Sequence, residues 1–227
     1  MIRRSAAPIV ALAVLLAGCT GAQDAAFDLG LTDTSSVSVD YYPIQGNSIE
    51  ALDTQIKRKG PRVAGNRHAV AVARISMQPK MSYRRGPNGC AVSDANVAVN
   101  ARVTLPAWTG RAEADRRLGA QWDNIDRYTR LHEAVHVAIA FRHARALERR
   151  LVTMAPAPSC IAARRRAAKL ARRALEAHDR SQQMFDRREQ SRIAAMRRRG
   201  PRPDGDDFGE PHVPKGLGLK REAVQGA

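Results

Sequence analysis

Two histidines and a glutamate near the middle of the chain have the types and the spacing of a metalloprotease motif. Residues 131–137 read Leu-His-Glu-Ala-Val-His-Val, which contains His-Glu-x-x-His. In a helix, residues i and i+4 project from one face, so His132 and His136 can bind one Zn²⁺ ion and leave a position open for water. Glu133 then lies where its carboxylate can act as general base toward that zinc-bound water. The alternative is a solvated helix face on which two histidines stack by chance.

The N-terminus carries a second motif. Two arginines precede an apolar run, residues 6–17, that is too short to cross a bilayer as a mature helix. The run leads into Leu-Ala-Gly-Cys, which resembles the end of a bacterial lipoprotein signal. We therefore expect residues 1–18 to be a signal peptide, Cys19 to be lipidated, and residues 19–35 to tether an exported domain to a membrane of the cell envelope. An ordinary secretory signal with an incidental cysteine is the alternative.

Two further cysteines remain. Cys90 and Cys160 form an even pair in a chain that we expect to be exported into an oxidising compartment. They predict one disulfide that ties the sheet region to the second long helix. A thiol nucleophile is the alternative, but neither residue has an activating partner near it in the sequence.

The motif must be positioned by the elements on either side of it. Upstream, apolar and polar residues alternate with the period of half-buried strands. The strands are expected at residues 37–41, 68–76, 80–85 and 97–105. Asn47 can cap a helix that Gly60-Pro61 ends. These patterns predict a small, mainly antiparallel sheet with one helix.

Downstream of Trp108 the apolar period changes to that of helices. Residues 111 to about 150 contain no proline, and a second helix is expected from about 159 to 199. We therefore expect an α+β fold in which the sheet packs with two long helices, with the motif on the first, and in which residues 36–199 form the folded domain. The tail, residues 200–227, has ten Gly or Pro in 28 residues and is expected to be disordered.

The chain is strongly basic, with 38 Lys and Arg against 22 Asp and Glu. Residues 161–199 hold 13 Lys and Arg against 4 acids, so much of the excess lies on the second long helix. Such an excess suggests nucleic acid in a cytosolic protein, but export argues against that partner. Anionic envelope lipid or polymer is the expected neighbour, and a solvated basic face without any partner is the alternative.

Several short motifs occur in the order that one known family has. They are Tyr41-Tyr42-Pro43-Ile44-x-Gly46, Lys59-Gly60-Pro61, Cys90, Leu105-Pro106-x-Trp108, Trp122 and His132-Glu133-x-x-His136. Over roughly residues 37–190 the chain resembles the bacterial family described as predicted secreted zinc-dependent proteases. The resemblance implies a zincin-like fold, Zn²⁺ as cofactor and a peptide or protein substrate.

A third zinc ligand is needed, and it must come from another segment. His143 lies seven residues beyond His136, about 10 Å along the helix axis, which is too far for a ligand of the same ion. The metzincin pattern needs Gly and His where this chain has Ile139 and Arg142. The second long helix offers Glu176, His178, Asp179, Asp186 and Glu189.

The resemblance implies Asp186 as that ligand. The family's second helix ends in a Tyr-Asp-x-x-Thr-x-His-Gly pattern, and residues 184–189, Met-Phe-Asp-Arg-Arg-Glu, match its beginning. The Thr and the His-Gly are absent from this chain. For each acid taken singly, an exposed charge that pairs with a neighbouring arginine is the alternative.

Three functions are compatible with these residues. The first is an envelope-anchored zinc metallopeptidase, in which a sheet edge receives an extended peptide. The second is a non-catalytic envelope lipoprotein of zincin-like fold that binds peptide or anionic envelope components. The third is an envelope scaffold whose basic helix binds anionic polymer or lipid.

Overall fold

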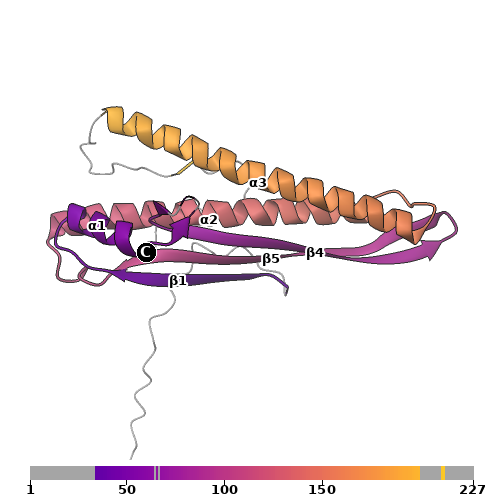
Figure 1. Ribbon diagram of the computed structural model, residues 1–227, viewed down its shortest axis with the longest axis horizontal. Helices are drawn as coiled ribbons and strands as arrows, with labels where there is room; N and C mark the ends of the chain where they lie inside the picture. The colour runs from indigo at the N-terminus through magenta and orange to yellow at the C-terminus, as the bar shows by residue number, and fades with distance from the viewer. Residues whose placement is uncertain (1–33, 64, 66, 200–210, 213–227) are drawn as a thin grey trace, which may run out of the picture.

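The computed structural model describes residues 34–63, 65, 67–199 and 211–212. In these ranges the chain forms an elongated α+β structure in which α2 (Arg116–Val152) packs on a sheet and α3 (Cys160–Arg199) packs on α2 and on one end of the sheet (Figure 1). The predicted signal peptide and the predicted lipidation site, Cys19, fall outside the described residues, as does the tail apart from residues 211–212. In the described part of the chain, no helix has both the length and the apolar character that crossing a bilayer requires.

The main sheet has three strands, β1 (Ser36–Ile44), β4 (Val72–Gly86) and β5 (Gly89–Trp108), in the order β1-β5-β4. β4 and β5 form an antiparallel hairpin, whereas β1 runs parallel to β5. The sheet is therefore mixed, and the prediction of a mainly antiparallel sheet needs correction. Alternation of apolar and polar residues determines which side chains face the core, but it does not determine which strands are neighbours or in which direction they run.

Both strands of the hairpin are longer than the sequence pattern predicts. β4 continues through Pro79, where the pattern suggested a break between two strands. β4 is an edge strand, and a proline is tolerated there because one side of the strand needs no donor. The hairpin turns at residues 87–88, and β5 then runs for 20 residues.

Helix α1 (Ile49–Lys59) covers one end of the sheet. Its N-cap is Ser48, whose hydroxyl accepts a hydrogen bond from the Ala51 N–H, so the prediction of Asn47 as the cap is wrong. Leu52 and Ile56 are buried in a cluster with both tryptophans of the chain. A two-stranded ribbon, β2 (Arg62–Val63) and β3 (Arg67–His68), then leads into β4.

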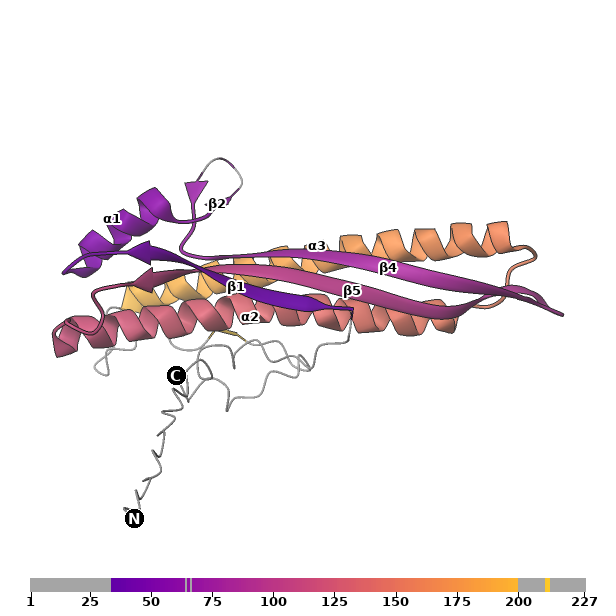
Figure 2. The ribbon, with the colours of Figure 1, turned by 90° about the horizontal axis from the view of Figure 1, so that it is seen from below.

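The main core lies between the sheet and α2 (Arg116–Val152). Val99, Val103 and Leu105 of β5 pack against a buried face of α2 that includes Val137 and Leu147. The helix begins five residues later than the sequence pattern suggests, because the Asp115 side chain caps it through the Leu118 N–H. The opposite face of β4 is polar, and among the described residues no helix packs along that side of the sheet (Figure 2).

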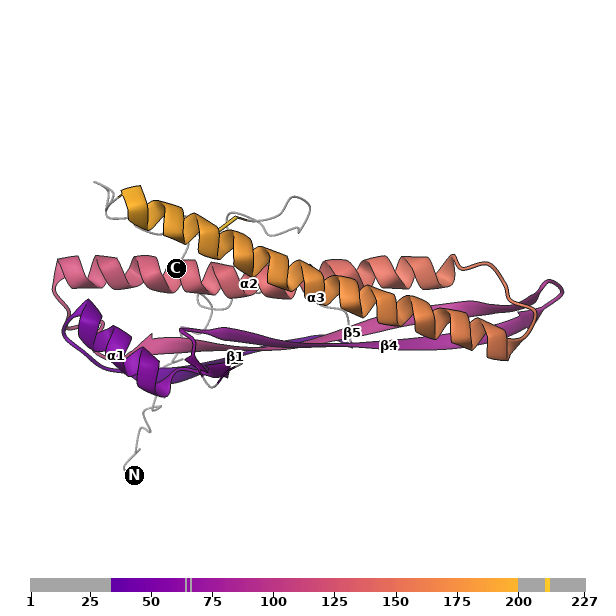
Figure 3. The ribbon, with the colours of Figure 1, turned by 45° about the horizontal axis from the view of Figure 1, so that its top comes forward.

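Helix α3 (Cys160–Arg199) runs antiparallel to α2 and crosses it at an angle (Figure 3), so that its start lies beside the β4–β5 hairpin and its C-terminal end lies away from the sheet. In its first half the buried residues are alanines, at positions 163, 167, 171 and 174, which we call the alanine seam. Small side chains allow two helices to approach closely. In the second half the buried residues are His178, Phe185 and Glu189, and Phe185 packs against Val135, Ala138 and Ile139 of α2.

The start of α3 is fixed to the hairpin. A disulfide joins Cys90 to Cys160, as the sequence predicts, with a Cα–Cα distance of 5.0 Å. Cys90 and Ala157 also exchange two backbone hydrogen bonds of 2.8 Å each. Gly89 beside them has a positive φ of 110°, and a Cβ atom there would lie 2.2 Å from the Ala157 carbonyl oxygen. This close approach requires glycine.

Candidate metal centre

Polar side chains of α2 and the second half of α3 meet in pairs along the interface of the two helices. Tyr128 donates a hydrogen bond to Glu189, His132 and His136 face Asp186, and His136 also contacts Gln182. The contacts advance by about one turn up α2 for each turn down α3, as antiparallel helices require. We call the α3 residues of this interface, His178, Gln182, Asp186 and Glu189, the polar seam.

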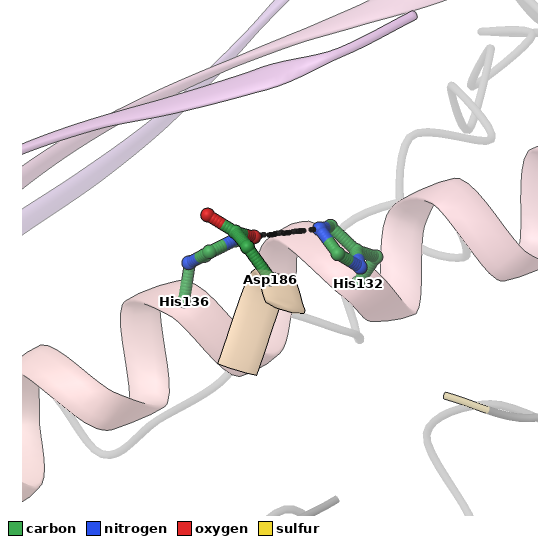
Figure 4. A group of neighbouring side chains, drawn as sticks. All are labelled: His132, His136 and Asp186. Atoms are coloured by element: carbon green, nitrogen blue, oxygen red, sulfur yellow. Dashed lines mark hydrogen bonds and ion pairs between the residues drawn. The ribbon is translucent and has the colours of Figure 1, made fainter. Parts of the chain in front are cut away.

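The three residues in the middle of this interface direct their donor atoms toward one another (Figure 4). The His136 Nε2 atom lies 2.9 Å from Asp186 Oδ1 and 3.2 Å from the His132 Nε2 atom. The His132 Nε2 atom lies 3.5 Å from the same carboxylate oxygen. Each residue therefore offers one ligand atom to a common point between α2 and α3.

Charge and burial favour a histidine pair that faces an ionised carboxylate. Burial opposes ionisation of Asp186, but hydrogen bonds from His132 and His136 outweigh it and hold the pKa of that carboxyl well below its ordinary value. Burial would also lower the pKa of His136, yet the bonds to Asp186 and Gln182 and the charge of Glu133 raise it. The cluster thus attracts positive charge, whether that charge is a proton or a metal cation.

Gln182 fixes the orientation of His136. Its side-chain oxygen accepts a 2.6 Å hydrogen bond from the His136 Nδ1–H, which leaves Nε2 free to bind a metal. Its NH₂ group donates to the His136 carbonyl oxygen at 3.0 Å and to the His178 Nε2 atom at 2.8 Å. His178 in turn donates from Nδ1 to Asp179. All the hydrogen-bonding groups of the Gln182 amide are thereby used.

His132 is held differently. Its Nδ1 atom is buried and has no hydrogen-bond partner among the described residues. Its ring instead packs against Phe185, with ring centroids 4.8 Å apart, and Phe185 also contacts His136. Phe185 is almost fully buried, so it closes the apolar side of the cluster.

Glu133 lies next to the cluster but points toward the sheet. Its carboxylate is 5% exposed and accepts a hydrogen bond from the backbone N–H of Ala73 in β4. A strand N–H that donates to a side chain instead of the neighbouring strand lies on the free edge of the sheet. Burial raises the pKa of Glu133 above its ordinary value, although His136 and His132 partly oppose the shift. Glu133 therefore has an increased affinity for a proton and lies beside the histidines.

A cavity of about 510 Å³ adjoins the cluster. His132, Glu133 and Asp186 form part of its wall. Most of the remaining wall is apolar and comes from α1, the first half of α2, the segment before β4 and the end of α3. We call this space the apolar cavity.

The other candidate ligands lie elsewhere. Glu176 is exposed, and Asp179 pairs with His178. Glu189 is buried, where it accepts hydrogen bonds from Tyr128, Arg192 and the His212 N–H. His143 contacts Ser181 at 2.9 Å. Among the described residues, only His132, His136 and Asp186 form a group whose donor atoms converge as a metal site requires.

Sequence reasoning missed Gln182 and Tyr128. Each lies four residues before a member of the cluster, Gln182 before Asp186 and Tyr128 before His132. A search of the same helix faces, one turn away from the predicted ligands, would have found both. The hydrogen-bond role of Gln182 could not be recognised without knowing the register of α3 against α2.

The geometry of the cluster suits zinc. Donors at the corners of a tetrahedron around Zn²⁺ lie about 3.3–3.6 Å apart, because Zn–N and Zn–O distances are about 2.0–2.2 Å. The three distances between donor atoms here are 2.9, 3.2 and 3.5 Å. Two imidazoles and one carboxylate also form the donor set of known catalytic zinc sites. The three residues can therefore hold a metal ion, and their donor set is one that zinc accepts.

Comparison with known proteins gives one match. Residues 39–192 match the family model described as bacterial protein of unknown function (DUF922). Neither the curated proteins nor the solved structures contain a significant match. The match covers the sheet, α1, α2 and most of α3, and it includes His132, Glu133, His136 and Asp186.

Proposed function

The chain belongs to this bacterial family, DUF922, whose description assigns no activity, and from the site itself we propose that it is a zinc-dependent metallopeptidase. His132, His136 and Asp186 hold the ion, and Glu133 is the general base. The enclosing arrangement of a sheet edge, a motif helix and a second helix that supplies the third ligand is zincin-like.

The observation that carries the proposal is the position of Asp186. It comes from a helix 50 residues downstream of His136, yet its carboxylate oxygen lies 2.9 Å from that histidine. A chance pair of histidines on a solvated face has no reason to meet an ionised carboxylate from another segment. Both histidine side chains are also largely shielded from solvent, with exposures of 21% and 13%.

The chain's own groups supply the proton transfers. A bound zinc ion would polarise the scissile carbonyl and lower the pKa of a water molecule at its open position. Burial raises the pKa of Glu133, which makes its carboxylate a stronger base than an exposed one, so it can accept a proton from attacking water and return it to the leaving amine. Gln182 keeps the His136 tautomer that presents Nε2 to the metal.

The free edge of β4 supports binding of an extended peptide. Glu133 contacts this edge through the Ala73 N–H, so a peptide paired with β4 would pass beside the general base. Main-chain hydrogen bonds along the strand would align the substrate and place its scissile carbonyl near the cluster.

We also propose that the activity operates at a membrane surface of the cell envelope. The support is the sequence motif that ends at Cys19 and the thirteen Lys and Arg of residues 161–199, most of which are exposed on α3. Anionic lipid or polymer is the partner that this charge favours.

Metal analysis and hydrolysis assays of purified full-length protein test the proposal. We expect about one zinc per chain, loss of that zinc in His136→Ala and Asp186→Asn, and cleavage of an unfolded protein substrate. Glu133→Gln should keep the zinc and lose hydrolysis, since an amide cannot accept the proton. The exposed Glu176→Gln is the matched control and should behave as the parent protein.

Two results would contradict parts of this proposal. Failure to take up zinc at neutral pH would exclude the metalloenzyme. Full zinc occupancy without cleavage of any member of a peptide library would favour the non-catalytic binding protein. The family's Thr and His-Gly are missing after Asp186, and this is the observation that favours the non-catalytic binding protein.

A further inference from the structure

The apolar cavity beside the cluster points to the kind of substrate. We propose that it binds a short stretch of the substrate peptide next to the scissile bond, and that the site selects large apolar residues there. This inference rests on the proposed peptidase function. The substrate peptide is the proposed occupant because His132, Glu133 and Asp186 of the proposed active site form part of the cavity wall.

The length of the cavity corresponds to several residues. Its wall extends along α2 from Trp122 to Glu133 and along α3 from Asp186 to Arg197. Each stretch contains twelve residues, and its eleven steps of 1.5 Å give a length of about 16 Å. An extended peptide advances about 3.3 Å per residue, so roughly four or five residues fit beside these two helices. A volume of about 510 Å³ lies in the range of cavities that enclose small ligands.

The chemistry of the wall favours apolar side chains. Apolar residues line it from every side: Leu52 and Ile56 on α1, Val70 before β4, Ile125 on α2 and Ile193 on α3. Several of the charged groups in the wall are already paired with neighbours. Asp53 pairs with Lys57, and Glu189 accepts hydrogen bonds from Tyr128 and Arg192. An apolar side chain that enters therefore loses water without displacing these pairs.

The cavity is also open to a chain that arrives from the cluster. Glu133 belongs both to the cavity wall and to the contact with β4, so a peptide held on the strand edge continues into the cavity. The exposed Gln190 in the wall offers an amide for the peptide main chain. A lipid acyl chain would use neither the strand edge nor this amide, and peptide is therefore the favoured occupant.

Binding of peptide hydroxamates to the zinc-loaded protein tests the inference without requiring turnover. The hydroxamate binds the metal, and the series differs in one side chain: Gly, Leu, Phe or Asp. By calorimetry we expect the Leu and Phe compounds to bind at least about tenfold more tightly than Gly, since burial of a large apolar side chain has that effect, and Asp to bind most weakly. Equal affinities across the series would overturn the inference.

Variants show whether the preference comes from this cavity. Val70 is 38% exposed, so Val70→Asp should fold and place a carboxylate in the wall. Val70→Asp should reduce the preference for the Leu over the Gly compound by roughly tenfold. Ile193→Trp, which fills the cavity from α3, should have the same effect. Ile161→Asp is the control, because Ile161 is 66% exposed and lies at the start of α3. A Leu preference that survives both cavity variants would place the selectivity elsewhere.

A metal-free readout separates failure of this inference from failure of the proposed function. Trp122 lines the cavity, whereas Trp108 does not, so tryptophan emission reports occupancy. Capped tetrapeptides of leucine should shift the emission of the metal-free protein, capped tetrapeptides of serine should not, and Val70→Asp should abolish the shift. If the protein takes up no zinc but shows this shift, the proposal that the apolar cavity binds peptide stands and the proposal of a zinc peptidase fails. A shift with a fatty acid but with no peptide would replace the peptide by a lipid.

Discussion

The two halves of α3 are held to the rest of the molecule by different kinds of contact. Residues 160–174 are fixed by the disulfide to β5 and by the alanine seam, in which Ala163 packs beside the disulfide and the other three alanines pack into the main core formed by β5 and α2. Residues 178–199 contact α2 mainly through polar side chains, and the apolar cavity lies beside them. One helix thus combines a close-packed half with a half that carries the proposed chemistry.

The two halves of α3 therefore have different roles: the first half positions the helix, and the second half carries the proposed metal ligand. Small apolar contacts determine where the helix lies and cost little side-chain entropy to form. The polar groups that face each other across the second half need a positive charge between them, because an ionised carboxylate and two imidazole nitrogens converge there. The first half therefore positions the second, and four predictions test that dependence.

The largest effect is expected from removal of the disulfide. Cys90→Ala combined with Cys160→Ala should lower the free energy of unfolding by about 2–5 kcal/mol, because the cross-link constrains the unfolded chain. Zinc affinity of the folded protein should change by less than about tenfold, since the alanine seam still positions α3. Denaturant titration and metal competition measure the two quantities. A large loss of affinity would mean that the disulfide, not the seam, positions Asp186.

Overpacking the seam should affect both properties. Ala167 is fully buried, so Ala167→Leu should lower the free energy of unfolding by about 1–3 kcal/mol and move α3 away from α2. Zinc affinity should fall with it. Ala168→Leu is the matched control on the exposed face and should change neither quantity. If stability falls while zinc affinity stays constant, the two halves are independent and the dependence proposed above is wrong.

The orienting contact of Gln182 should affect metal binding more than folding. Gln182→Ala removes the partner of the His136 Nδ1–H and should weaken zinc binding by about 10- to 100-fold. The neighbouring Gln183→Ala changes an exposed amide and serves as control. Zinc competition with a chelating dye measures both variants. Unchanged affinity in Gln182→Ala would show that Phe185 and the helix backbone suffice to orient His136.

The smallest effect concerns acid stability of the second half. Arg192 and the His212 N–H outweigh burial and hold the pKa of Glu189 below its ordinary value of 4.5. Its stabilisation is therefore complete above about pH 4.5 and is lost as the pH falls toward the lower folded-state pKa. In metal-free protein, Glu189→Gln should lower stability at pH 7 by on the order of 1 kcal/mol and flatten the acid limb of the pH profile. An acid limb identical to that of Glu176→Gln would contradict this role.

Sequence patterns predicted the elements of this fold better than their assembly. The helix periods and the proline pair at 156 and 158 indicated α2 and α3, and cysteine parity indicated the disulfide. The parallel pairing of β1 with β5 was not predictable, because alternation carries no information on strand direction. Ser48, not Asn47, caps α1, since neighbouring residues with equal capping ability cannot be ranked from sequence.

For the candidate site, local spacing was informative and long-range pairing was not. His132 and His136 could be placed on one face from the four-residue interval alone. The position of Asp186 beside them depends on the register of two helices, which the resemblance to a family implied but no periodicity determines. The apolar cavity is formed by segments from three helices and a loop, and no single sequence window contains it.

The alanine seam has a mechanical consequence. Asp186 lies 12 residues beyond Ala174, the last alanine of the seam, or about 18 Å along the axis. At that length, a tilt of the second half of α3 by one degree about Ala174 would displace Asp186 by about 0.3 Å. Metal–ligand distances tolerate only about 0.2 Å. A bound ion would therefore hold the second half of α3 at one angle. A partner that binds its exposed basic face and changes that angle would change the affinity of the site for metal. The tilt of α3 and the occupancy of the metal site would therefore change together.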